Sequence, residues 1–272
     1  LLGKPDGPVP GGRGHFEPRG PQYWDRPEIP YAISPELPHP ERIEKALAYL
    51  RQKTPVNFVP FQGQPDAIVF ETGSENCLSP LGRVGGLQPI KLSGGCQTQE
   101  ILHEILHALG FVHEQSRTDR DQYVEILWDN IDEKYADQFA LVPESFLEPI
   151  RGFPFDFHSV MLYRTAAFTK SPGLANMKAV GSEIISPVAE GLSDGDIKRL
   201  RRSHTEIGAA LLDKAFPDSH PLIDLTRDIM LNHHEQMDGK GYRGLPGNAL
   251  SLPVRLACIV ESYDGYTIPR PH

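Results

Sequence analysis

The sequence EILHEILHALGFVHEQSRTDRDQY, residues 100–123, contains three histidines and a glutamate at a spacing that metal chemistry explains best. On a helix, His103 and His107 project from one face about one turn apart, so their imidazoles can bind one ion. Gly110 permits the left-handed turn that ends a helix, which brings His113 to the same ion from outside it. We therefore predict that the three histidines bind one metal ion.

Glu104 follows the first of these histidines, where its carboxylate can reach a metal-bound water without being a ligand itself. General-base hydrolysis needs this arrangement. The alternative is an ordinary buried helix, because Leu102, Ile105 and Leu106 are apolar and a lone histidine among them would usually be a core residue. The complete H-E-x-x-H-x-x-G-x-x-H string rarely arises by chance, so we favour the metal site.

Together with the later segment SVMLY at residues 159–163, this string resembles the astacin family of zinc endopeptidases, which are metzincins. The similarity extends through residues 110–126 and covers about residues 22–200. The resemblance implies an α+β fold of two lobes, with a cleft that crosses the zinc. It also implies Zn²⁺ as the cofactor, a protein or peptide as the substrate, and the zinc ligands His103, His107, His113 and Tyr163.

The resemblance assigns roles to individual residues as well. Glu104 would be the general base of an endopeptidase that hydrolyses peptide bonds by metal-activated water. Met161 would lie beneath the zinc, and the Tyr163 hydroxyl would be a ligand that swings to stabilise the transition state. The mature N-terminus of the family lies near the glutamate that corresponds to Glu114. Without the histidines, Met161 and Tyr163 would be read as core residues.

The sequence contains three cysteines, so at least one is unpaired within the chain. By the same resemblance, Cys77 and Cys96 correspond to a disulfide of the astacin fold, and Cys258 would be free. Pro55 stands where the family's second, long-range disulfide has a cysteine. One disulfide favours an oxidising compartment. The protein would then be secreted or periplasmic, if a leader has been removed.

Composition limits the classes of partner. The chain has 272 residues, 39% of them hydrophobic, and a formal charge of −9, which suggests neither nucleic acid nor an anionic membrane as a partner. No apolar run is long enough to span a bilayer.

Residues 87–92 resemble the family's edge strand that pairs with substrate, although a plain edge strand fits equally well. Residues 125–140 have a helical pattern. The sequence leaves the oligomeric state open.

We divide the chain into three parts. Residues 1–21 contain five prolines and six glycines and are predicted to be a flexible arm, and residues 22–200 are predicted to be the protease domain. Residues 201–272 resemble the C-terminal half of an HD-GYP domain, a family of cyclic-dinucleotide phosphodiesterases that is cytoplasmic. We expect a small helical extension there, with helices at 198–213, 222–234 and 253–263. The basic cluster at 198–202, with Asp194 and Asp196, is interpreted as a solvated helix face.

The HD-GYP resemblance implies a partial metal site. In that family the positions of His204, His233 and His234 bind metal, and Glu261 stands where an aspartate ligand is expected. The His-Asp dyad of the family is missing, so we predict a vestigial site without phosphodiesterase activity. The alternatives to a protease are therefore a metal-dependent phosphodiesterase or a non-catalytic binding module.

Overall fold

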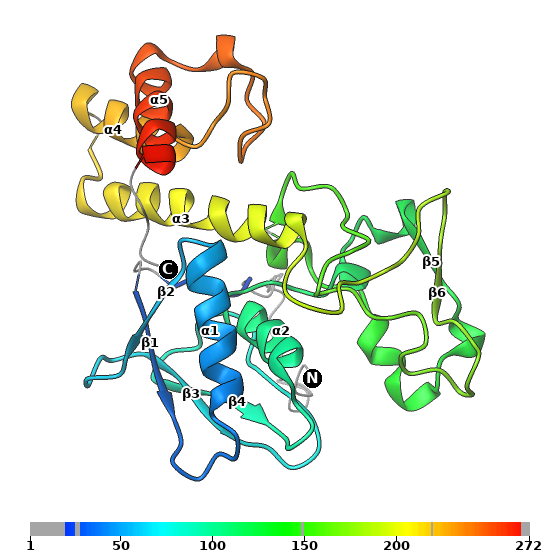
Figure 1. Ribbon diagram of the computed structural model, residues 1–272. Helices are drawn as coiled ribbons and strands as arrows, with labels where there is room; N and C mark the ends of the chain where they lie inside the picture. Colours follow the sequence, from blue (N-terminus) through cyan, green and yellow to red (C-terminus); the bar gives the residue numbers. More distant parts are fainter. Residues whose placement is uncertain (1–19, 25–27, 148–149, 219, 268–272) are drawn as a thin grey trace, which may run out of the picture.

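The computed structural model describes residues 20–24, 28–147, 150–218 and 220–267, and these form two lobes and a helical extension (Figure 1). Most of the arm predicted for residues 1–21 lies outside the described residues. The first lobe is a parallel sheet of four strands in the order β2-β1-β3-β4, with two helices that pack against each other beside it. Its elements are β1 (Glu28–Ile33), α1 (Glu41–Lys53), β2 (Asn57–Pro60), β3 (Ala67–Thr72), β4 (Leu87–Leu92) and α2 (Thr98–Ala108).

Apolar side chains at helical spacing explain how α1 joins this lobe. Ile43, Ala46, Leu47 and Leu50 are fully buried, and their spacing of three to four residues puts them on one face. They share a core with the inward side chains of β3 and β4 and with the apolar face of α2. Removal of this apolar surface from water is the main force that holds α2, with its two histidines, against the sheet.

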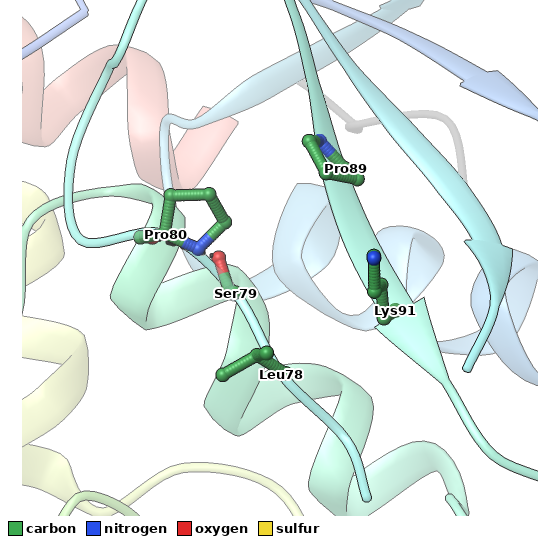
Figure 2. A pocket seen from close by; sticks show the side chains of 5 residues that line it. All are labelled: Leu78, Ser79, Pro80, Pro89 and Lys91. Carbon is green, nitrogen blue, oxygen red and sulfur yellow. Dashed lines mark hydrogen bonds between the residues drawn. The ribbon is translucent and has the colours of Figure 1, made fainter. Parts of the chain in front are cut away.

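β4 is an edge strand of the sheet, as predicted, but its outer side is partly covered. Leu78 pairs with Lys91 in the antiparallel sense, with N–H···O distances of 2.9 and 2.8 Å. Pro89, two residues earlier, has no N–H to offer a further strand. The segment at residues 78–80 is therefore an outer rim beside β4, and a small cavity of about 180 Å³ lies between them (Figure 2).

The second lobe contains little regular structure. β5 (Val124–Ile126) pairs in the antiparallel sense with β6 (Met177–Ala179), and Phe139, Phe155 and Leu162 pack with these strands in a second core. The helix expected at residues 125–140 is wrong: this stretch contains β5 and a 3-10 helix at Glu133–Phe139. The strand depends on pairing with residues about fifty positions away, which local periodicity cannot reveal.

The extension consists of α3 (Asp194–Ala215), α4 (Pro221–Asn232) and α5 (Leu252–Thr267). These helices agree with the three that the sequence predicts. The predicted domain boundary at 200/201 falls inside α3, so a continuous helix joins the extension to the two lobes (Figure 1). α4 packs on α3, and α5 packs on α4. None of the helices in the described part of the chain has the length and apolarity needed to cross a membrane.

Candidate metal centre

α2 begins and ends where its local sequence requires. Gln97 caps its start, and the Gln97 N–H donates to Glu100 Oε2 at 2.9 Å. Gly110 follows its end with φ of +98°, a conformation that other residues rarely adopt. A side chain at Gly110 would also meet the Tyr23 ring at 3.0 Å. The chain reverses at this glycine and returns His113 to the face of α2.

The three predicted ligands converge. The Nε2 atoms of His103 and His107 each lie 3.1 Å from Nε2 of His113. Zinc–nitrogen bonds of about 2.0–2.1 Å in a tetrahedral site place ligand nitrogens about 3.3 Å apart, which is close to this spacing. Among the described residues, this is the one group of three or more potential ligands that lies within 4.8 Å.

The far side of two rings is fixed by backbone carbonyls. His103 Nδ1–H donates to the Val160 carbonyl and His107 Nδ1–H donates to the Phe111 carbonyl, each at 2.8 Å. The Nε2 lone pairs are thus directed at one point. Burial lowers the pKa of all three histidines, and it does so strongly for His107 and His113, so the rings are neutral and able to bind metal. Three converging lone pairs repel one another unless a cation lies between them, so the residues fit zinc.

Glu104 lies beside this cluster without belonging to it. Its side chain is buried, and burial raises the pKa of its carboxyl to about 7, while a hydrogen bond from the Ser79 backbone acts in the opposite direction. A nearby divalent cation would also lower this pKa, because it stabilises the carboxylate. A carboxyl that titrates near neutrality is suited to accept and release a proton.

Tyr163 packs against His113, the third histidine of the cluster. The centroid of its ring is 4.5 Å from the centroid of the His113 ring. Its hydroxyl donates to Gln138 Oε1 at 3.3 Å, a partner that the sequence did not indicate. Burial, with a contribution from the charge of Glu104, raises the pKa of Tyr163, so the phenol keeps its proton at neutral pH. Its expected role as a zinc ligand stays a prediction.

Comparisons with known proteins agree with this geometry. Residues 17–205 match the model of the peptidase family named Astacin. The chain belongs to the astacin family. It is 37% identical over 190 residues to zinc metalloproteinase nas-7 of Caenorhabditis elegans, which covers 68% of this chain and 49% of that protein. It is 36% identical over 195 residues to the astacin-like metalloendopeptidase of Gallus gallus, and the match covers 69% of this chain and 46% of that protein.

A solved structure supports the same assignment. High choriolytic enzyme 1, a hatching enzyme zinc-protease from Oryzias latipes, is 34% identical to this chain, with a TM-score of 0.58 over 64% of this chain and 86% of that chain. The predicted two-lobed α+β fold is thereby confirmed. This chain spans about half the length of the curated relatives it matches. None of these findings supports the resemblance of residues 201–272 to HD-GYP domains.

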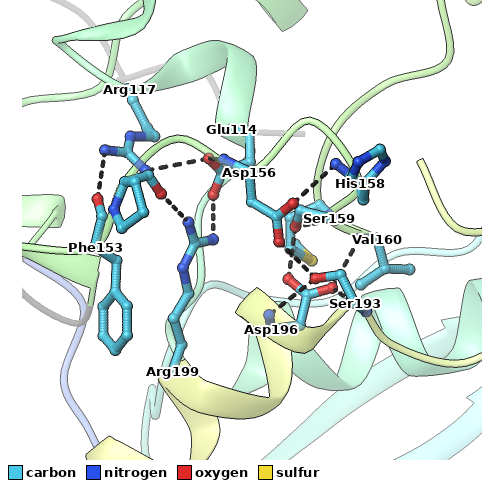
Figure 3. A network of polar contacts seen from close by, with 12 residues as sticks. Glu114, Arg117, Phe153, Asp156, His158, Ser159, Val160, Ser193, Asp196 and Arg199 are labelled. Atoms are coloured by element: carbon cyan, nitrogen blue, oxygen red, sulfur yellow. Dashed lines mark hydrogen bonds and ion pairs between the residues drawn. The ribbon is translucent and has the colours of Figure 1, made fainter. Parts of the chain in front are cut away.

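Two residues that the astacin resemblance placed near the zinc are fully buried. Met161 lies in the first core, and its carbonyl accepts a hydrogen bond from the Glu114 N–H at 3.0 Å. The carboxylate of Glu114 pairs with Arg117 Nη1 at 3.1 Å and with Arg199 Nη1 (Figure 3). The resemblance predicts that the mature N-terminus lies near Glu114. Within the described chain, these two guanidinium groups are its cationic partners.

The start of α3 corrects one prediction. Asp196 is 0% exposed and Arg199 is 1% exposed, so the solvated helix face expected around residues 194–202 is wrong at both positions. Arg199 pairs with the buried carboxylate of Glu114, and Asp196 accepts the Val160 N–H at 2.9 Å. The sequence indicated only that Asp196 and Arg199, three residues apart, lie on one side of a helix. It did not identify their partners.

The predicted disulfide is present between Cys77 and Cys96, whose Cα atoms are 6.0 Å apart, and Cys258 is free. In the extension, His233, His234 and Glu261 line one polar cavity of about 470 Å³. His234 Nδ1 lies 3.9 Å from Glu261 Oε1. His204 is on α3, but its side chain lies outside the described part of the structure.

Proposed function

We propose that this chain is a zinc-dependent endopeptidase that hydrolyses peptide bonds in proteins. The observation that carries the proposal is the convergence of three Nε2 atoms, with 3.1 Å between His113 and each of the other two, beside the buried Glu104. Membership of the astacin family supports it, since the relatives described above are named as metalloproteinases. His103, His107 and His113 would hold the zinc.

Zinc in such a site acidifies a water molecule and polarises the scissile carbonyl. In this proposal Glu104 accepts the proton of the attacking water and then delivers it to the leaving amine. Tyr163 leaves Gln138 and donates its O–H to the oxygen that becomes negatively charged. The raised pKa of Tyr163 supports this role, because a donor must keep its proton at neutral pH.

The substrate in this proposal is an extended peptide that lies along the rim at residues 78–80. The Ser79 backbone lies close enough to Glu104 to lower the pKa of its carboxyl, so this rim borders the reacting groups. Main-chain pairing at such a rim selects for an extended backbone more than for a particular side chain. The Cys77–Cys96 disulfide is consistent with a protein that functions in an oxidising, extracytoplasmic compartment.

Digestion of casein by purified variants tests the function. Glu104→Gln keeps the size of the side chain but removes the base, so it should retain one zinc per chain and lose about 10²-fold or more of the kcat. His107→Ala should lose both zinc and activity, and a strong chelator should inactivate the unmodified protein. Chelator-insensitive cleavage that is undiminished in Glu104→Gln would contradict the mechanism. Unchanged zinc content in His107→Ala would contradict the site.

A further inference from the structure

Two buried charged side chains stand one turn apart at the start of α3. Ser193 caps the helix, with its Oγ 2.9 Å from the Asp196 N–H, and Arg199 follows three residues later. Both are fully buried, and buried charges are costly unless partners compensate them. Asp196 bonds to Ser159 and Val160, and Arg199 pairs with Glu114, which follows His113 (Figure 3). Asp196 also accepts the Ser193 N–H at 3.1 Å, and Arg199 donates to the Pro154 carbonyl at 3.0 Å.

Asp196 is connected to His103, the first ligand, through a single residue, Val160. Its Oδ1 accepts the Ser159 hydroxyl at 2.6 Å, and its Oδ2 accepts the Val160 N–H at 2.9 Å. Ser159 Oγ in turn accepts the Met161 N–H at 3.0 Å, so the carboxylate fixes this whole turn. The Val160 carbonyl is the acceptor that orients His103, at 2.8 Å. A change at Asp196 therefore shifts the group that aims the His103 ring.

Arg199 reaches the third ligand through its neighbour in the chain. Glu114 follows His113 directly and is 0% exposed. Its Oε1 pairs with Arg199, whereas its Oε2 accepts from Arg117 Nη1 and from the Asp156 N–H, each at 3.1 Å. Without Arg199, one oxygen of this buried carboxylate has no partner from α3, and the turn that carries His113 loses an anchor.

We propose that Asp196 and Arg199 are positioning residues for the metal site, such that α3 aligns His103 through Val160 and His113 through Glu114. The inference rests on the proposed role of the three histidines as zinc ligands. Residues that orient metal ligands typically change metal affinity by about 10–100-fold when they are altered. Neither side chain contacts the reacting atoms, so their effect is on the alignment of the ligands.

The test measures zinc affinity rather than cleavage alone. Asp196→Asn keeps the shape but replaces one acceptor oxygen by an NH2 group, which can only donate. Arg199→Met removes the cation at similar length. Competition with a chromophoric chelator should show zinc bound about 10–100-fold more weakly in both variants. Arg199→Lys keeps the charge and should recover part of that loss. The cobalt-substituted variants should also show an altered visible spectrum, because ligand geometry sets that absorption.

Arg202→Met is the matched control. Arg202 is also on α3, donates to Glu206 and to the Arg151 carbonyl, each at 2.6 Å, and lies over the Phe153 ring. None of these partners is hydrogen-bonded to the three histidines, so its loss should leave zinc affinity unchanged. If the unmodified protein binds no zinc, the proposed function fails. If it binds zinc and the folded Asp196→Asn, Arg199→Met and Arg199→Lys variants bind it within about twofold as tightly, this inference alone is wrong. Equal loss of thermal stability in the metal-free and zinc-loaded forms, without loss of affinity, would assign a purely structural role.

Discussion

The three histidines of the proposed zinc site were predictable as single residues, because their chemistry and spacing lie in one short stretch of sequence. The partners that aim them were not. His103 is oriented by the carbonyl of Val160, 57 residues away, and every residue type supplies such a carbonyl. Gln138 likewise contacts Tyr163 across 25 positions without any motif. Backbone acceptors and lone amides carry no sequence signature, so only the fold reveals them.

Tyr163 offers a direct test of the proposed mechanism. Tyr163→Phe keeps the ring beside His113 but removes the hydroxyl, so one donor to the developing oxyanion is lost. Loss of one such donor typically costs about 10²–10³-fold in kcat, and we expect this with little change in KM or zinc content. Steady-state kinetics on a chromogenic peptide would measure it.

Gln138→Ala provides the control for Tyr163. It removes the acceptor that holds the hydroxyl at 3.3 Å and leaves the hydroxyl itself in place. Its kcat should therefore stay within about tenfold of the unmodified enzyme, well above that of Tyr163→Phe. A kcat for Tyr163→Phe that equals that of the unmodified enzyme would remove Tyr163 from the mechanism.

Elements with a clear local pattern were more predictable than elements that depend on pairing with distant residues. α1 and α2 follow from apolar residues at helical spacing, and α3 follows from the Ser193 cap. β5 was missed because its stability comes from pairing with β6, which lies beyond the reach of local pattern. The cover on β4 was missed for the same reason, since Leu78 reaches Lys91 through a loop and not through a strand motif.

The Cys77–Cys96 disulfide links that rim to the start of α2. Cys77 precedes Leu78, Cys96 lies two residues before Thr98, and the two cysteines are 19 positions apart. Cys77→Ser together with Cys96→Ser should lower the free energy of unfolding by about 2–4 kcal/mol. Denaturant unfolding would measure the loss, and peptide mapping without reductant would identify the bridge.

Cys258→Ser is the control for the disulfide. Cys258 is partly buried in the extension, where its thiol makes a weak contact of 3.5 Å with the Asn232 carbonyl. We expect its replacement to change the free energy of unfolding by no more than about 0.5 kcal/mol. A peptide that joins Cys258 to either of the other cysteines would show that the pairing is wrong.

Taken as one molecule, the chain couples its parts through α3. The same helix carries Asp196 and Arg199 at one end and packs against α4 at the other. The family match ends at residue 205, ten residues before α3 ends. The sequence predicted the three helices of the extension but placed a domain boundary inside α3, because resemblance to two families changes near residue 200 while the backbone continues without a break.

Phosphodiester hydrolysis at a two-metal centre would need more ligands than the described residues of the extension bring together around the cavity of His233, His234 and Glu261. Two-metal hydrolysis needs two ions about 3.5–4 Å apart, with ligands for both. In the described part of the chain, the group able to hold a metal is the histidine cluster of the protease lobes. His233 directs its Nδ1 at the carbonyls of Ile229 and Met230, at 3.1 and 2.9 Å, so Nε2 is the ring nitrogen that it could offer to a metal.

We therefore expect no turnover of a cyclic dinucleotide or of bis-p-nitrophenyl phosphate by the full chain, with manganese or ferrous iron added. Release of product would be followed by chromatography or absorbance, and His233→Ala should be indistinguishable from the unmodified protein. Glu104→Gln separates the two centres, because any weak hydrolysis that arises at the histidine cluster should fall in this variant. Turnover that persists in Glu104→Gln and disappears in His233→Ala would place a second catalytic site in the cavity lined by His233, His234 and Glu261.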